Sequence, residues 1–139
     1  MIEPYNKKDY QEMREFYFQI LYESRHFIPY TPTLDKGHFN SPQRTNFVVK
    51  REDKIVAHLT LFSDSEKLYE VGVAILKEHW GKGFGSVLLK YAEQNIKTNG
   101  AEKIVALIDP DNWRSILLFT KQGYKVVDEG KYLRLEKEL

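Results

Sequence analysis

The sequence of 139 residues contains no cysteine. This absence excludes disulfides, thiolate metal ligands and a cysteine nucleophile, but it does not identify a compartment. The chain also lacks any apolar run close to the ~20 residues of a membrane span. Its start carries Glu3, Lys7, Lys8 and Asp9 instead of the apolar core of a signal peptide. We therefore expect a cytoplasmic protein without a membrane partner.

An excess of one charge is absent too. The chain has 21 Lys and Arg against 20 Asp and Glu, a net charge of +1, and the two signs are interleaved. Nucleic-acid binders usually carry a clustered positive surface, so no nucleic-acid partner is expected. The four histidines, His26, His38, His58 and His79, lack the spacing of metal ligands. We expect them at the surface or in the core, and we expect no metal site.

The length and the 42% of apolar residues fit a single domain over residues 1–139. Residues 2–5 predict a short strand, and Asp9 is the expected cap of a helix that ends near Ser24. The apolar residues of this helix recur at steps of three and four: Met13, Phe16, Tyr17, Ile20 and Leu21. Residues 26–42 contain three prolines and a glycine, which predicts a long loop.

The next segments have the composition of strands. Residues 46–50, 54–62 and 67–76 are rich in Val, Ile, Leu and aromatics and are separated by polar turns, which predicts an antiparallel meander. Over residues 84–99 the hydrophobic period changes to 3.6, which predicts a helix that Asn99-Gly100 ends. The expected apolar face of this helix consists of Phe84, Val87, Leu88, Tyr91, Ala92 and Ile96.

The C-terminal part completes a mixed α/β sandwich. Residues 103–108 form a nearly continuous apolar run, which is typical of a strand covered on both faces. Because this run follows a strand and a helix, we expect a right-handed parallel crossover. Asn112 and Gly123 are expected to begin and end a further helix. Residues 124–127 and 131–136 then predict a closing hairpin.

Three alternating glycines mark the junction between the expected strand and the long helix. The segment reads Trp80, Gly81, Lys82, Gly83, Phe84, Gly85, Ser86. Glycine lets the backbone adopt positive φ and approach a ligand closely, and the first N–H groups of the following helix have no partners within the helix. The helix dipole and the charge of Lys82 add positive potential, so the segment is suited to phosphate.

Two other phosphate-binding loops fit this segment less well. A Walker-type loop requires Ser or Thr after its lysine, whereas Gly83 follows Lys82. A dinucleotide fingerprint requires a third glycine where Ser86 stands, and a larger parallel sheet than the rest of the chain can supply. The remaining alternative is that the glycines only shape a tight turn between strand and helix.

These residues resemble the signature of the GNAT family of N-acetyltransferases, which is Gln or Arg, two residues, Gly, one residue, then Gly or Ala. Trp80 stands at the first position, and Gly83 and Gly85 stand at the two small ones. Further on, the family tends to have Asn, a small residue, Tyr, Gly and an aromatic. This sequence has there Asn112, Ser115, Phe119, Gly123 and Tyr124. The resemblance covers about residues 47–135.

The resemblance implies acetyl-CoA as co-substrate and a central mixed sheet, flanked by helices, whose parallel strand pair splays. The pantetheine arm would enter between residues 69–76 and 103–109, and Gly72 suits a bulge that opens the pair. An N–H near Val73 would polarise the thioester carbonyl. The coenzyme-binding residues implied are Val73, Ala74, Ile75, Trp80, Gly81, Lys82, Gly83, Phe84, Gly85, Ser86, Asn112, Ser115 and Phe119.

Direct transfer to an amine requires a base, an oxyanion donor and a proton for the leaving thiolate. Glu70 is the predicted base, and the alternative is that it is an ion-pairing residue of an edge strand. Phe119 stands where many family members have the tyrosine that protonates the sulfur, and a phenyl ring cannot donate. Two functions therefore remain: an active N-acetyltransferase, or a catalytically weak acyl-CoA-binding regulatory module.

The expected partner is a small-molecule or peptide amine, and the family builds the pocket for it largely from the first helices. In this chain that segment contains Tyr17, Tyr22, Arg25, His26, Phe27 and Tyr30. An aromatic-lined cleft suits a sugar-nucleotide amine, an amino acid, a peptide end or a polyamine, and Tyr17 fits the core equally well. The sequence does not decide the acyl chain length, nor between a monomer and a homodimer.

Overall fold

The computed structural model of the protein describes residues 1–23, 41–63 and 65–139. Its strands form one seven-stranded sheet in the order β1-β2-β3-β4-β5-β7-β6. They are β1 (Ile2–Pro4), β2 (Arg44–Arg51), β3 (Lys54–Ser63), β4 (Leu68–Ile75), β5 (Lys103–Ile108), β6 (Lys125–Glu129) and β7 (Leu133–Glu138). The helices are α1 (Tyr10–Glu23), α3 (Phe84–Thr98) and α4 (Trp113–Lys121), with short 3₁₀ turns η1 (Lys7–Asp9) and η2 (Lys77–His79).

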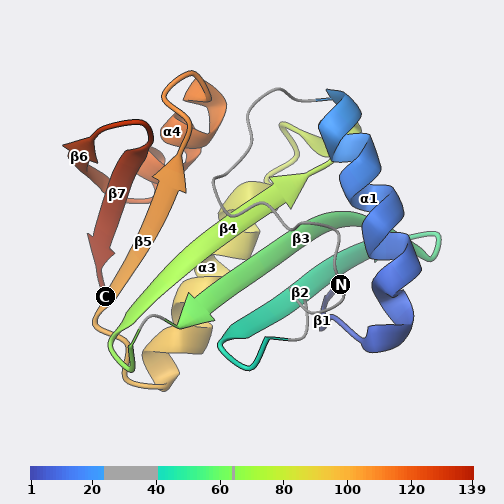
Figure 1. Ribbon diagram of the computed structural model, residues 1–139, viewed down its shortest axis with the longest axis horizontal. Helices are drawn as coiled ribbons and strands as arrows, with labels where there is room; N and C mark the ends of the chain where they lie inside the picture. Colours follow the sequence, from blue (N-terminus) through green and yellow to red (C-terminus); the bar gives the residue numbers. More distant parts are fainter. Residues whose placement is uncertain (24–40, 64) are drawn as a thin grey trace.

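Strands β4 and β5 form a parallel pair that parts after a short stretch. They pair only at Leu68–Lys103, Tyr69–Ile104 and Glu70–Val105, although both strands continue beyond these residues. In Figure 1 the two arrows begin side by side and diverge toward their tips. The predicted mixed sheet with a splayed parallel pair is therefore confirmed.

The predicted bulge at Gly72 is wrong. Strands β3 and β4 stay in one register from Ser63–Tyr69 to Ala57–Ile75, and Gly72 pairs with Thr60 without a shift. The gap arises because β4 keeps its bonds to β3 while β5 pairs with β7 along its full length. No extra residue is needed to open the sheet at this point.

The two faces of the sheet carry separate cores. Along β2, Phe47 and Val49 pack in a cluster with α3, whereas Val48 packs with α1. This alternation follows from the two-residue period of a strand. Figure 1 shows α1 in front of the sheet and α3 behind it. The two faces of the sheet are therefore covered by different helices.

Helix α3 is fixed by residues that are almost fully buried. Leu88 and Leu89 are both 0% exposed, and burial of such a side chain contributes about 1.5–3 kcal/mol. Val87 was expected on this face but is 49% exposed. The buried stripe runs at four-residue steps through Gly85 and Leu89 as well as through Leu88, so Val87 lies on its solvent side.

The start of the first helix differs from the prediction. Asn6, not Asp9, is the capping residue, and its Oδ1 accepts a hydrogen bond from Lys8 N at 3.1 Å. Asp9 lies one turn further on, where its Oδ2 accepts from Asn6 N and its Oδ1 from Lys50 Nζ. Leu21 was expected on the apolar face but is 41% exposed. Ser24, the predicted helix end, and most of the predicted loop lie outside the described residues.

The C-terminal part of the chain contains the predicted helix and the predicted hairpin. Asn112 caps α4, because its Oδ1 accepts from Ser115 N at 3.3 Å, and Gly123 follows the helix with a φ of +95°. The closing hairpin is present as β6 and β7, and β7 rather than β6 lies against β5. Among the described residues, no helix has both the length and the apolar character to cross a membrane.

Candidate functional site

The loop before α3 owes its shape to two glycines. Gly81 and Gly83 have φ values of +74° and +84°, which side-chain-bearing residues rarely adopt. A Cβ at either position would meet nothing within 4 Å, so the backbone conformation and not crowding requires glycine here. Gly83 is the N-cap of α3, where it offers no side chain to the first free N–H groups.

The third glycine has a different role. A Cβ at Gly85 would lie 2.7 Å from Cδ2 of Leu118, which is closer than side-chain carbons approach. Gly85 therefore allows α3 to pack tightly against α4. Because the two helices bound the same gap, this contact sets the distance between the glycine loop and α4.

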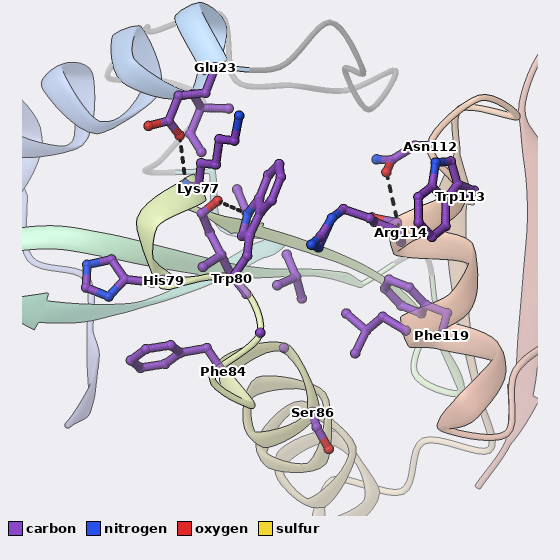
Figure 2. Close-up of a pocket in the computed structure, with 18 of the residues that line it drawn as sticks. Glu23, Lys77, His79, Trp80, Phe84, Ser86, Asn112, Trp113, Arg114 and Phe119 are labelled. Atoms are coloured by element: carbon purple, nitrogen blue, oxygen red, sulfur yellow. Dashed lines mark hydrogen bonds between the residues drawn. The ribbon is translucent and has the colours of Figure 1, made fainter.

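Trp80 connects the loop to both sides of the gap. Its Nε1 donates a hydrogen bond to the carbonyl of Ile75 at the end of β4, at 2.9 Å. The guanidinium carbon of Arg114 lies 4.5 Å from the centroid of the Trp80 ring. Figure 2 shows Arg114 extending from α4 toward Trp80. Cation–π contacts of this kind contribute about 0.5–1 kcal/mol at exposed sites.

A cavity of about 680 Å³ includes this loop. It extends from α1 past the end of β4 to the start of α4. Figure 2 shows labelled side chains of α1, α3 and α4 around it. The sequence-predicted residues in its described lining are Val73, Ala74, Ile75, Trp80, Gly81, Gly83, Phe84, Gly85, Ser86, Asn112, Ser115 and Phe119. Residues that lie far apart in the sequence are thus brought to one cavity.

Two predicted residues lie elsewhere. Lys82 lines a second cavity of about 560 Å³, bounded by α1 and the hairpin of β2 and β3. Glu70 is not among the described lining residues of either cavity. It occupies the last paired position before β4 and β5 part, opposite Val105 on one side and Phe62 on the other. Since β4 is an interior strand, the edge-strand interpretation of Glu70 is wrong.

Three polar side chains that no sequence pattern connects form a buried chain of hydrogen bonds. Tyr17 of α1 has its hydroxyl oxygen 2.6 Å from Nδ1 of His58 in β3. Nε2 of His58 lies 2.8 Å from Oδ1 of Asn46 in β2. Tyr17 also belongs to the lining of the first cavity. The available sequence signal was a histidine in the middle of an apolar strand, which is unusual enough to mark a buried polar contact.

Burial raises the pKa of the Tyr17 phenol well above its ordinary value, and the charge of Arg44 offsets only part of this effect. The hydroxyl is therefore protonated at neutral pH and can donate a hydrogen bond.

Phe119 supplies no hydroxyl to the cavity that it lines. Its ring is 4% exposed and packs edge-on against Tyr124 with 4.9 Å between centroids. The Tyr124 hydroxyl donates to Glu93 at 3.1 Å, and the Thr120 hydroxyl donates to the carbonyl of Leu117. Neither of these nearby hydroxyls belongs to the described lining of the cavity.

The α1 end of the cavity is lined by Tyr17, Ile20 and Glu23. Glu23 fixes the turn after β4, because its Oε1 accepts from Lys77 N at 2.8 Å. Tyr22, which was expected in an acceptor pocket, is 88% exposed. The other expected acceptor residues, Arg25, His26, Phe27 and Tyr30, lie outside the described residues. Over the described part of the chain, no group of three or more metal-ligating side chains is found.

Comparison with known proteins identifies one family and one fold. A family model described as the acetyltransferase (GNAT) family matches residues 8–124. The fold is similar to that of the GNAT domain of S. lividans PAT, at 20% identity and a TM-score of 0.84, covering 99% of this chain and 89% of that one.

Two further solved structures have the same fold. PaiA N-acetyltransferase from Thermoplasma acidophilum, in complex with coenzyme A, is 16% identical with a TM-score of 0.85, covering 100% of this chain and 98% of that one. YncA from Salmonella typhimurium, with its cofactor acetyl-CoA, is 20% identical with a TM-score of 0.76, covering 99% of this chain and 92% of that one. No curated protein matches the chain by sequence.

Proposed function

The chain belongs to the acetyltransferase (GNAT) family, and on that premise we propose that it transfers an acetyl group from acetyl-CoA to a primary amine. The observation that carries this proposal is the junction of two features at one cavity. A glycine loop with free helix N-terminal amides lies beside strands that stop pairing after Glu70 and Val105. The first feature suits a diphosphate, and the second suits an extended arm.

The proposed coenzyme site follows the cavity. The amides of Gly83, Phe84 and Gly85 would bind the diphosphate, and Arg114 would add a charge. The arm would run along β4, where strand β5 no longer occupies the hydrogen-bonding edge. The Ile75 carbonyl already accepts a bond from Trp80, so the arm would rely chiefly on groups nearer Val73. Two proteins of the same fold have been solved with coenzyme A or acetyl-CoA, which supports this use of the cavity.

The proposed reaction is direct attack of the amine on the thioester carbon. Glu70, at the fork of the two strands, would take one proton from the ammonium form, through water, to give the nucleophile. The Val73 N–H would stabilise the oxyanion as the C–N bond forms. The C–S bond then breaks and the thiolate of coenzyme A leaves, which is feasible without strong assistance because thiols have a pKa of about 8.5.

A second function is an acyl-CoA-binding regulatory module with little activity. The observation that favours it is Phe119, which has no hydroxyl, together with the neighbouring hydroxyls of Tyr124 and Thr120, which bond elsewhere. Thiol release in the presence of acetyl-CoA and a panel of amines separates the two functions. Release above the background rate supports the enzyme, whereas acetyl-CoA-dependent thermal stabilisation without release on any amine supports the module.

The first prediction tests the coenzyme site with Gly83→Ala. Side chains at a φ of +84° cost roughly 1–2 kcal/mol, so the loop must change shape or carry this strain when it binds a diphosphate. We expect the affinity for coenzyme A, measured by titration calorimetry, to fall about tenfold, since 1.4 kcal/mol corresponds to that factor.

Gly100→Ala is the matched control. Gly100 has a φ of +87° and nothing within 4 Å of its Cβ position, but it follows the far end of α3, away from the described cavity lining. This variant should lose similar stability and keep the affinity for coenzyme A. Wild-type protein without affinity for coenzyme A, or equal affinity in wild type and Gly83→Ala, would rule out the proposed site.

A further inference from the structure

The buried chain of Tyr17, His58 and Asn46 joins three separate elements. Their side chains are 3%, 1% and 7% exposed. Burying polar groups in a core is unfavourable unless each finds a partner, and the two short hydrogen bonds of 2.6 and 2.8 Å supply such partners. The result is a fixed polar path through an otherwise apolar layer between α1 and the sheet.

When the His58 ring is neutral, its hydrogen-bond partners define which of its two nitrogens carries the hydrogen. Asn46 presents its carbonyl Oδ1 to His58, so Nε2 of the imidazole carries the hydrogen. Nδ1 of neutral His58 then has a lone pair and accepts the hydroxyl proton of Tyr17. Tyr17 is thus a donor toward His58, while its oxygen carries lone pairs that can accept a proton from another group.

The register of the sheet places this path next to β4, the strand of the proposed thioester site. His58 pairs with Ala74 of β4, and paired residues share one face of a sheet. Ala74, Val73 and Tyr17 line the same cavity. Val73 is adjacent to Ala74 in β4. It lies three residues from Glu70, and at ~3.3 Å per residue this separation is about 10 Å along the strand. The Tyr17–His58 pair therefore lies closer than Glu70 to the expected oxyanion donor.

We infer that Tyr17 and His58 form a proton relay for the second proton that the amine must lose, an inference that rests on the proposed acetyl transfer. Glu70 removes the first proton from the ammonium before attack. As the C–N bond forms, the nitrogen passes its next proton to the Tyr17 oxygen, and the Tyr17 hydroxyl proton moves to Nδ1 of His58. Asn46 Oδ1 holds the Nε2–H of the resulting imidazolium.

The relay is restored as the thiol leaves. When the C–S bond breaks, Tyr17 gives a proton to the thiolate and recovers one from His58 Nδ1. This transfer is favourable because an imidazolium, with an ordinary pKa of about 6.5, is more acidic than a thiol, at about 8.5. The products are the acetylated amine and the free thiol of coenzyme A. Tyr17 and His58 regain their starting protonation, and Glu70 releases the first proton to solvent. The relay thereby supplies the proton that Phe119 cannot donate.

The test compares Tyr17→Phe and His58→Gln with wild type, using the amine that gives the fastest thiol release in the panel. Both changes keep side-chain size, and the amide introduced by His58→Gln can still bond Tyr17 but cannot accept its proton. We expect kcat to fall on the order of 10²-fold in each variant, the lower end of general acid–base contributions. The KM for acetyl-CoA should stay within about twofold of wild type, because the proposed diphosphate site is formed by other residues, the amides of Gly83, Phe84 and Gly85.

Tyr124→Phe is the matched control, since it also removes the bonded hydroxyl of a buried tyrosine, here from Glu93. This variant should keep the wild-type kcat, which separates proton transfer from general loss of packing. An active wild type with an equally active Tyr17→Phe or His58→Gln variant would overturn the relay alone. A wild type that releases thiol with no amine of the panel would overturn acetyl transfer and the relay together.

Discussion

At the scale of single residues, two aromatic positions depart from the family pattern with opposite consequences. Trp80, at the first position of the glycine motif, uses its side chain to tie the loop to β4 and to receive Arg114. Phe119 instead removes a hydroxyl from the cavity and replaces it with an apolar edge contact to Tyr124.

Phe119→Tyr tests whether this position can recover an acid role. The new hydroxyl would extend from a ring that lines the cavity. We expect kcat to rise by no more than about tenfold, because a thiol of ordinary pKa about 8.5 needs little help to leave. The pH dependence of turnover should also change. Unchanged turnover across the pH range would exclude an acid role at this position.

At the scale of elements, the cavity depends on how β5 and α4 are held away from β4. Strand β7 pairs with β5 from Lys103–Glu138 to Ile108–Leu133, so β5 is bound on its other edge throughout its length. Lys103 and Glu136 add an ion pair of 3.0 Å across this pair of strands. Helix α4 is in turn held at close range to α3 by the missing side chain of Gly85.

Gly85→Ala should separate α3 from α4. Its Cβ would meet Leu118 at 2.7 and 3.1 Å, and overpacking of this kind costs about 1–3 kcal/mol of unfolding free energy. We expect urea unfolding to show a loss of about 1 kcal/mol in unfolding free energy. This is the lower end of the range, because the Leu118 atoms that the new Cβ would meet are the ends of a flexible side chain.

Leu118→Ala provides the second arm of this test. It removes both crowded methyl groups, so the double variant should be more stable than the sum of the single losses predicts. Strict additivity of the two changes would show that the Gly85–Leu118 contact does not limit the approach of the helices.

At the scale of the whole molecule, two buried tyrosines lie in the two separate cores. Tyr17 belongs to the α1 cluster and Tyr124 to the α3 cluster. Burial raises the pKa of both phenols, and for Tyr124 the charge of Glu93 raises it further. The two phenol pKa values are raised in the folded protein only. Both buried tyrosines therefore make the free energy of unfolding depend on pH over the same alkaline range.

Alkaline pH should therefore destabilise the fold. The unfolded chain releases these phenolic protons from about pH 10, whereas the folded protein keeps them, so stability is complete below pH 10 and declines above it. Each tyrosine contributes a slope of about 1.4 kcal/mol per pH unit. Urea unfolding between pH 9 and 11 should show a shallower decline in Tyr17→Phe and in Tyr124→Phe.

Tyr22→Phe serves as the control for this series, because the Tyr22 side chain is 88% exposed. It should decline as wild type does. Two results would contradict the assignment of the alkaline loss of stability to the two buried phenols. One is a wild-type unfolding free energy that stays constant between pH 9 and 11. The other is an equal slope of unfolding free energy against pH in all four proteins.

The sequence by itself determined the order and type of the elements and the location of the glycine loop. A period of 3.6 over residues 84–99 and apolar runs on either side are local patterns, so α3 and its neighbouring strands were predictable. Positive φ at Gly81 and Gly83 is likewise a local requirement. Local patterns are less exact about faces and ends, which is why Val87, Leu21 and the Asp9 cap were predicted wrongly.

Only the tertiary structure decided which side chains meet. Tyr17 and His58 are 41 residues apart in the sequence, and their contact depends on how α1 docks on the sheet. Arg114 reaches Trp80 because α3 and α4 approach closely at Gly85. Strand register and helix docking arise from the packing of the complete core, which no local period of a sequence encodes.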